Sequence, residues 1–255
     1  MMIPDLDLGR RFVAERGPAG RVLLCAVTGA HLYGFPSPDS DLDLKGIHLA
    51  PTPTLLGLQV PSESHDRLEI FEGVECDLTT HEARMALSLL LRGNGNVLER
   101  LLSPLQLVGG PDVEALQALG RGAISQRFAA HYRGFFQGMR REHDRQGTAK
   151  TMLYSLRVAL TGTHLLRTGE LEASLAVLGP EYGLPEVAEL IAAKGAGQEK
   201  GPLDAGLDAH FRGRWAGLEQ GLALALARSP LSPEPQNAAA CHDWLVGARL
   251  AELHA

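Results

Sequence analysis

Residues 22–44 decide the fold, and they read VLLCAVTGAHLYGFPSPDSDLDL. The stretch begins with a continuous apolar run of strand length at 22–27, which is typical of a buried strand. A loop rich in glycine, proline and serine follows. Residues 41–47 then alternate polar and apolar side chains, which is the period of a strand with two different faces. The stretch therefore predicts two strands joined by a long loop.

Acidic side chains recur at intervals of two residues on the predicted strands. Asp41 and Asp43 share one face, because side chains two positions apart on a strand point the same way. Adjacent carboxylates repel one another unless a cation bridges them, and oxygen ligands favour Mg²⁺ or Mn²⁺ over zinc. Residues 68–78 predict a later strand on which Glu75 and Asp77 share a face. If that strand lies beside the first, a third carboxylate completes a two-metal site.

A glycine turn precedes the paired aspartates. Gly29 follows the buried strand, where the backbone of a glycine can approach a phosphate and free N–H groups can bind it. Lys45 falls on the face of Asp41 and Asp43, where it either contacts a phosphate or neutralises the two aspartates. Alone, a glycine after a strand is usually only a turn, and a D-x-D strand is usually a solvated edge. The combination with a later acidic strand is far more specific.

This combination resembles the DNA-polymerase-β-type nucleotidyltransferase superfamily, and most closely the RlaP-type predicted nucleotidyltransferases linked by name to RNA repair. Tyr33-Gly34 and residues 39–47, DSDLDLKGI, carry the closer resemblance. The resemblance implies the same three residues as metal ligands and catalytic residues: Asp41, Asp43 and Asp77. It also implies that Gly29 makes the triphosphate turn. The family serine after that glycine is Ala30 here, so backbone N–H groups, with Thr28 or Ser40, would hold the phosphate instead.

The order of helix and strand signals predicts two domains. Strand and helix signals alternate up to Gly109-Gly110-Pro111, and only helix signals follow. The chain is therefore expected to be α+β, with a small mixed β-sheet flanked by helices in a nucleotidyltransferase domain at 1–110 and an all-helical domain at 111–255. Thr79 and Glu82 have the spacing of a capping box, which predicts a helix beginning after Thr79. Another helix is predicted over 149–168.

Basic side chains concentrate in one part of the chain. Residues 121–167 carry nine basic and two acidic side chains, although the whole chain has a net charge of −6. Lys150, Tyr154 and Arg157, with Thr161 and His164, form one stripe on the predicted helix. Arginine and lysine suit phosphates and tyrosine can stack on a base, so we expect this stripe to bind nucleotide. The alternative is a solvated stripe, with Tyr154 and His164 packed against a neighbour.

The expected activity is Mg²⁺- or Mn²⁺-dependent transfer of a nucleoside monophosphate from a nucleoside triphosphate to an acceptor hydroxyl, with release of pyrophosphate. The acceptor is an RNA end, a small molecule or a protein hydroxyl. One alternative, favoured by Ala30, is a catalytically weak or inactive nucleotide- or RNA-binding regulator on the same fold. Another is a partner-binding protein of a toxin–antitoxin type, which would expose a large apolar patch on its helical domain.

The composition predicts the cellular compartment and excludes some classes of partner. The 255 residues are 45% hydrophobic and 21% charged, which is ordinary for a soluble globular protein. The net charge excludes a generally basic nucleic-acid coat, and the apolar runs are too short to span a bilayer. The acidic N-terminus predicts no signal peptide. Three widely spaced cysteines, Cys25, Cys76 and Cys241, are expected to be buried apolar residues. A cytoplasmic protein without a membrane partner is expected.

Overall fold

The computed structural model describes residues 4–58, 60–198 and 201–254, which form two compact units. A helical unit comprises Ala30–Ser40 and Ile124–Glu234, and a sheet unit comprises residues 4–29, Asp41–Ala123 and 235–254. The chain crosses between the units several times, so they do not coincide with the predicted division into 1–110 and 111–255. The predicted α+β class, with a mixed sheet and an all-helical part, is confirmed.

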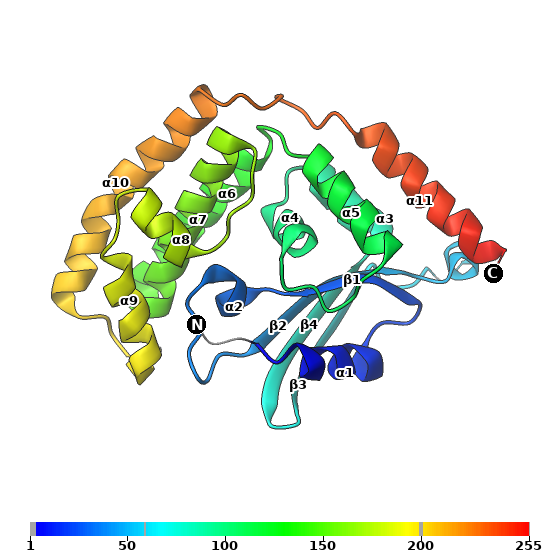
Figure 1. Cartoon of the computed structure of the whole chain (residues 1–255), viewed down its shortest axis with the longest axis horizontal. Coiled ribbons are helices and arrows are strands. Elements are labelled where there is room, and N and C mark those ends of the chain that lie inside the picture. Colours follow the sequence, from blue (N-terminus) through cyan, green and yellow to red (C-terminus); the bar gives the residue numbers. More distant parts are fainter. Residues whose placement is uncertain (1–3, 59, 199–200, 255) are drawn as a thin grey trace. The chain divides into compact units, whose positions relative to one another are not determined.

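Among the described residues, four strands form one mixed sheet in the order β1-β2-β4-β3 (Figure 1). β1 (Arg21–Val27) pairs antiparallel with β2 (Leu42–Leu49), and β2 pairs parallel with β4 (Val74–Glu82). β3 (Ser64–Phe71) lies at the far edge, antiparallel to β4. The prediction of one strand over 68–78 is wrong, because Glu72 and Gly73 adopt positive φ and turn the chain into a hairpin.

Alternation along the strands separates an apolar face from a polar one. Leu42 and Leu44 of β2 and Leu78 of β4 are buried in a core with α1 (Leu6–Arg16), which runs beneath the sheet in Figure 1. Cys25 and Cys76 are buried in the same core, and Cys241 is buried in α11 (Ala238–Leu253), as the sequence predicts. Burial raises the pKa of Cys25 to about 12, so it stays an uncharged thiol. Polar residues of the strands lie on the opposite face.

The last helix belongs to the sheet unit because it is tied there by charge. α11 contacts α3 (Ala83–Leu91) and the short helix η1 (Thr52–Leu55). Its Arg249 forms an ion pair with the buried Glu82 and donates to the carbonyl oxygen of Ala50 at 2.7 Å. α4 (Gly95–Leu102) and α5 (Pro111–Gly122) contact β1 and complete this unit. A helix that follows the predicted boundary therefore packs with residues that precede it.

The predicted capping box at Thr79 is wrong. β4 continues through Thr79 to Glu82, because it is paired with β2 on one side and β3 on the other. Glu82 itself is the N-cap of α3, and its carboxylate accepts a hydrogen bond from the Arg84 backbone N–H at 2.8 Å. Pairing on both sides outweighs the local capping pattern.

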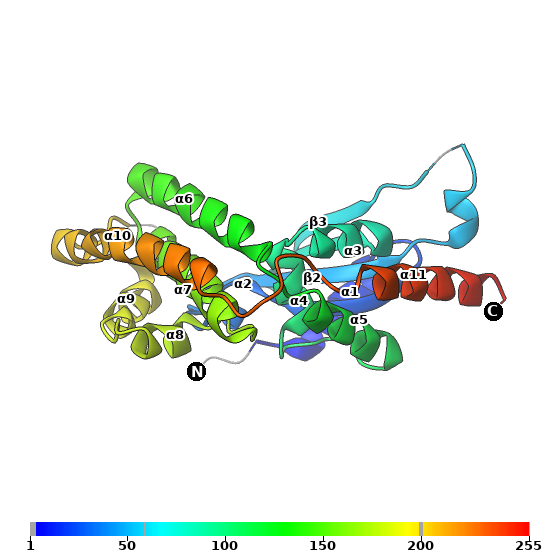
Figure 2. The same cartoon turned by 90° about the horizontal axis from the view of Figure 1, so that it is seen from above.

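In the helical unit, α7 (Ala149–Thr168) is the central helix. It is contacted by α6 (Phe128–Gln146), α8 (Leu175–Glu181), α9 (Val187–Ala193) and α10 (Ala205–Ala227), and α6 and α10 run beside it (Figures 1 and 2). The predicted bounds 149–168 are confirmed. The helix begins after Thr148, whose side chain accepts from the Thr151 N–H, and ends at Gly169 with φ 78°. No helix among the described residues combines the length and apolarity needed to cross a membrane.

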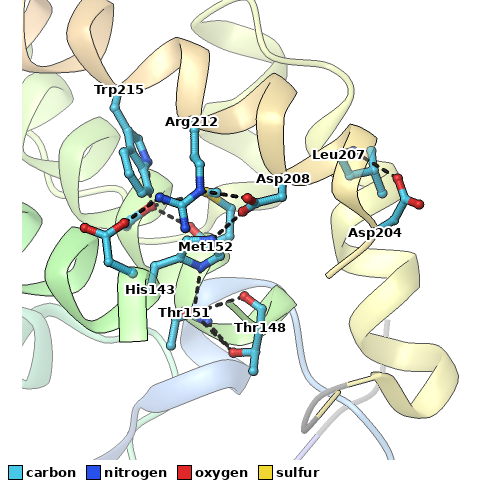
Figure 3. A network of polar contacts seen from close by, with 11 residues as sticks. His143, Thr148, Thr151, Met152, Asp204, Leu207, Asp208, Arg212 and Trp215 are labelled. Carbon is cyan, nitrogen blue, oxygen red and sulfur yellow. Dashed lines mark hydrogen bonds and ion pairs between the residues drawn. The ribbon is translucent and has the colours of Figure 1, made fainter. Parts of the chain in front are cut away.

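A polar network joins α6, α7 and α10 (Figure 3). The fully buried His143 lies between Thr151 and Asp208, with Nδ1 2.8 Å from the threonine Oγ1 and Nε2 2.6 Å from the aspartate Oδ1. The other Asp208 oxygen accepts from Arg212 Nε at 2.7 Å. Burial alone would raise the pKa of Asp208, but hydrogen bonds from His143 and Arg212 outweigh it and lower that pKa. A charged Asp208 therefore stabilises the packing of the three helices.

We expect Asp208→Ala to lower the free energy of unfolding by about 2–3 kcal/mol, because a buried histidine nitrogen loses its charged partner. Glu219→Ala, on the same helix, removes a more exposed ion pair with Arg140 and should cost about 0–1 kcal/mol. Urea unfolding at neutral pH measures both changes. The Asp208 contribution should disappear as the pH falls below the ordinary aspartate range, because its folded pKa is the lower one. Equal losses in the two variants would show that the network does not stabilise the unit.

Candidate active site

A glycine turn lies directly against the first strand carboxylate. β1 ends at Val27, and the Thr28 N–H then donates to the Asp43 carbonyl oxygen at 2.8 Å. Gly29 follows with φ +59°, and a Cβ added to it would lie 1.8 Å from Asp43 Oδ2. Any side chain at position 29 would therefore collide with this carboxylate. Sequence and geometry agree that only glycine fits between the end of β1 and Asp43.

The parallel pairing of β2 with β4 places two of the predicted carboxylates side by side. Asp43 and Asp77 are register partners, so their side chains project from the same face of the sheet. Asp41 is exposed and lies one residue before β2 begins. In the part of the chain that the structure describes, no three histidine, cysteine or acidic side chains are grouped so that they could hold a metal ion. The structure thus brings together Asp43 and Asp77, and leaves Asp41 at the strand entrance.

Lys45 pairs with the third predicted carboxylate. Its Nζ donates to Asp77 Oδ2 at 2.8 Å and to Thr79 Oγ1 at 3.2 Å. The Asp77 side chain is 40% exposed, so this pair contributes about 1 kcal/mol or less to folding and can be rearranged by a ligand. The sequence left two roles open for Lys45, contact with a phosphate or neutralisation of the aspartates. In the structure, Lys45 neutralises Asp77.

The other predicted nucleotide-binding residues belong to the helical unit. Ala30 is buried, and Lys150 is exposed. Arg157 is fully buried, and its guanidinium carbon lies 3.8 Å from the centre of the Tyr33 ring. Tyr154 packs edge-on against Tyr33, with ring centroids 5.6 Å apart. The stripe on α7 is therefore packed at Tyr154 and Arg157, and a nucleotide contact of these residues stays a prediction.

Sequence reasoning missed a lysine that contacts Ser40. Lys194 follows α9, and its Nζ lies 3.3 Å from Ser40 Oγ and 2.8 Å from Ser37 Oγ. Only 1% of Lys194 is exposed. A single lysine after an alanine pair shows no periodicity and belongs to no motif, so the sequence carries no signal for this contact.

The half-buried His81 and the buried His48, on neighbouring strands, make the sheet unit sensitive to acid. His81 Nδ1 lies 3.1 Å from Nη1 of the buried Arg100, which also donates to the Gly46 carbonyl oxygen. Burial, and next the charge of Arg100, lower the pKa of His81 to about 4. Burial also lowers the pKa of His48, whose Nδ1 lies 2.8 Å from Thr80 Oγ1. His81 is therefore neutral at physiological pH and can accept the arginine hydrogen bond.

Residues 10–245 match the model of a protein family described as RlaP, the RNA repair pathway DNA polymerase beta family. No match to this chain was found among curated proteins. Among solved structures, the chain is similar to a nucleotidyltransferase-like protein from Exiguobacterium sibiricum 255-15. The sequence identity is 13% and the TM-score 0.34, over 98% of this chain and 78% of that chain.

We expect the sheet unit to lose stability as the pH falls from about 6.5 to about 4. Unfolded His81 takes up a proton near its ordinary value of 6.5, whereas folded His81 stays neutral until about pH 4. The unfolded chain therefore binds more protons in this window, so stability decreases as the pH falls. Urea midpoints at pH 7.5 and 5 measure the effect.

His81→Gln should make this pH dependence weaker, because glutamine can accept from Arg100 and does not titrate. His242→Gln, an exposed change on α11, should leave it as in the wild type. If the urea midpoint of His81→Gln changes between pH 7.5 and pH 5 as much as that of the wild type, His81 is not the cause of the pH dependence.

Proposed function

We propose that this chain, which belongs to the RNA repair pathway DNA polymerase beta family, is a metal-dependent nucleotidyltransferase. It transfers a nucleoside monophosphate from a nucleoside triphosphate to an acceptor hydroxyl and releases pyrophosphate. The observation that carries the proposal is the pairing of Asp43 with Asp77 beside the turn at Gly29. Carboxylates and a phosphate-binding turn are then next to each other, which is what phosphoryl chemistry with a metal requires.

Mg²⁺ or Mn²⁺ suits the residues of this site. The donors are carboxylate oxygens, and the backbone at Gly29 passes so close to Asp43 that a phosphate on the turn would lie beside the carboxylate. Asp41, Asp43 and Asp77 would hold the ions. When bound, such ions lower the pKa of an acceptor hydroxyl and stabilise the charge of the departing pyrophosphate. The cation that now neutralises part of this charge is the ammonium of Lys45.

The protein residues bind and orient the nucleotide. The backbone N–H groups at Gly29 and Ala30 donate hydrogen bonds to a phosphate. Ala30 has no side-chain hydroxyl to add to them. Lys45, which donates to Asp77, has a flexible aliphatic chain and would be able to donate to a phosphate oxygen instead. In the helical unit, the proposed nucleotide-binding residues are Lys150, Tyr154 and Arg157, whereas the hydroxyl of Ser40 is engaged by the Ser37 N–H and by Lys194.

The acceptor we favour is an RNA end, in keeping with the description of the family. α6 supplies a suitable surface, since Arg133 and Arg141 are both exposed on it. Arginines on a helix can neutralise successive phosphates of a polynucleotide backbone. A small molecule or a protein hydroxyl as acceptor would leave transfer independent of these two arginines.

A second function is favoured by the ion pair between Lys45 and Asp77. An ammonium that stays on Asp77 would exclude a metal ion, and Ala30 supplies no phosphate-binding hydroxyl. The chain would then be a nucleotide- or RNA-binding regulator. Incubation with Mg²⁺, each labelled nucleoside triphosphate and a short RNA separates the two functions. The transferase releases pyrophosphate, whereas the regulator binds without releasing it.

We expect Asp41→Asn and Asp43→Asn each to abolish nucleotide transfer, because each removes one charge from the metal-binding set. The melting temperature of Asp41→Asn in metal-free buffer should stay level, because this exposed side chain lies outside β2. Glu114→Gln, an exposed change on α5 of the same unit, serves as the control and should retain activity. Wild-type turnover in either aspartate variant would refute the metal-dependent mechanism.

A further inference from the structure

The segment Ala30–Ser40 connects β1 to β2, yet it belongs to the helical unit. Its last residues form a closed turn: the Ser40 N–H donates to the Ser37 carbonyl oxygen at 3.0 Å, and the Ser37 N–H donates to Ser40 Oγ at 2.9 Å. The two hydroxyl oxygens lie 2.9 Å apart. Lys194, the residue after α9, completes the arrangement, with Nζ 2.8 Å from Ser37 Oγ and 3.3 Å from Ser40 Oγ. One ammonium therefore holds both ends of the turn.

Because Lys194 is buried, its ammonium depends on hydrogen bonds to protein groups in place of water. Lysine is almost never fully buried unless it is paired, because removing its charge from water is costly. Here 1% of the residue is exposed, and its charge also acts on His31 in the same segment. Burial first, and then the Lys194 charge, lower the pKa of His31. Methionine would fill much the same space but would donate nothing to the serines.

The rest of the segment is fixed to the helical unit as well. Arg157 lies over Tyr33, and Phe35 packs edge-on against Tyr154 with ring centroids 5.4 Å apart. Gly34 has φ +81°, and a Cβ there would lie 2.4 Å from Ser174 Oγ. The aromatic contacts hold the middle of the segment, and Lys194 holds its end.

That end continues directly into the proposed site. Ser40 is bonded to Asp41, and Asp43 follows on β2, while the start of the segment is bonded to Gly29. The conformation of residues 37–40 therefore sets the direction in which the chain enters β2. Asp41 lies outside β2 and has no strand pairing to orient it, so it depends on this turn more than Asp43 does.

We propose that Lys194 is a positioning residue for nucleotidyl transfer, which orients Asp41 for metal–nucleotide binding by holding the turn of residues 37–40. This inference rests on the proposed function. Lys194 acts through Ser37 and Ser40 and does not itself contact the reacting atoms. This role for Lys194, the residue after α9, is not indicated by any motif of the sequence.

Lys194→Met tests the role with two measurements. The Mg²⁺ concentration that half-saturates binding of a non-hydrolysable triphosphate should rise about ten-fold, as expected for loss of one charged hydrogen bond. Chymotrypsin cleavage after Tyr33 should be faster, because the segment opens more often. Ser40→Ala should produce the same rise, and Ser40→Thr should restore most of the wild-type value.

A purely structural role would give a different result. Ser229→Ala removes another partly buried serine hydrogen bond of the helical unit, to the Leu166 carbonyl oxygen at 2.7 Å. It should lower the melting temperature without changing the Mg²⁺ requirement. If Lys194→Met behaves like Ser229→Ala, the positioning role is refuted. If Lys194→Met does not fold, a wild-type Mg²⁺ requirement in Ser40→Ala refutes it equally.

The test also separates this inference from the proposed function. Wild-type protein that binds no triphosphate at any Mg²⁺ concentration would refute the proposed function and the inference with it. Wild-type protein with Mg²⁺-dependent binding, and a Lys194→Met variant with the same half-saturation, would refute the inference alone. The double variant Lys194→Met/Ser40→Ala should be no worse than the more affected single variant, because both changes break one contact.

Discussion

The parallel pairing of β2 with β4 is the constraint on which the rest of the structure depends. It places Asp43 beside Asp77, although 33 residues of chain separate them. On the other face, the same register buries Leu44 and Leu78 in the core with α1. A shift of one residue would move the carboxylates into that core, where unpaired charges are prohibitively costly. The apolar core thus fixes the register, and the register fixes the position of the acidic pair.

The connection between the antiparallel strands β1 and β2 is constrained at both of its ends. At one end, Gly29 must pass against the Asp43 carboxylate, and at the other end a serine turn leads into Asp41. Between them, the segment Ala30–Ser40 packs with the helical unit through its aromatic side chains. One connection therefore carries the predicted phosphate turn, the entrance to the acidic strand and two aromatic residues that pack in the helical unit.

Part of the positive charge of residues 121–167 is neutralised within the helical unit. Arg157 is buried against Tyr33, and several other arginines form ion pairs within the helical unit. These pairs are Arg127 with Glu234, Arg140 with Glu219 and Arg145 with Glu142. Glu219 and Glu234 are distant in the sequence from the arginines they neutralise, whereas Glu142 lies three residues from Arg145. The charge count by itself does not reveal how much of this surface is available to a polynucleotide.

The sequence by itself determined the features that rest on local rules. The period of two placed Asp43 and Lys45 on one strand face, and helix signals that end at a glycine predicted the helix at 149–168. Tertiary structure decided the rest, because those choices depend on partners far along the chain. Pairing on both edges kept Thr79 in a strand despite its capping pattern, and the ion pair of Arg249 with Glu82 placed the last helix in the sheet unit. Lys194 contacts the loop before Asp41 because packing buries it beside two serines. No local sequence pattern predicts which buried hydroxyls a lysine will contact.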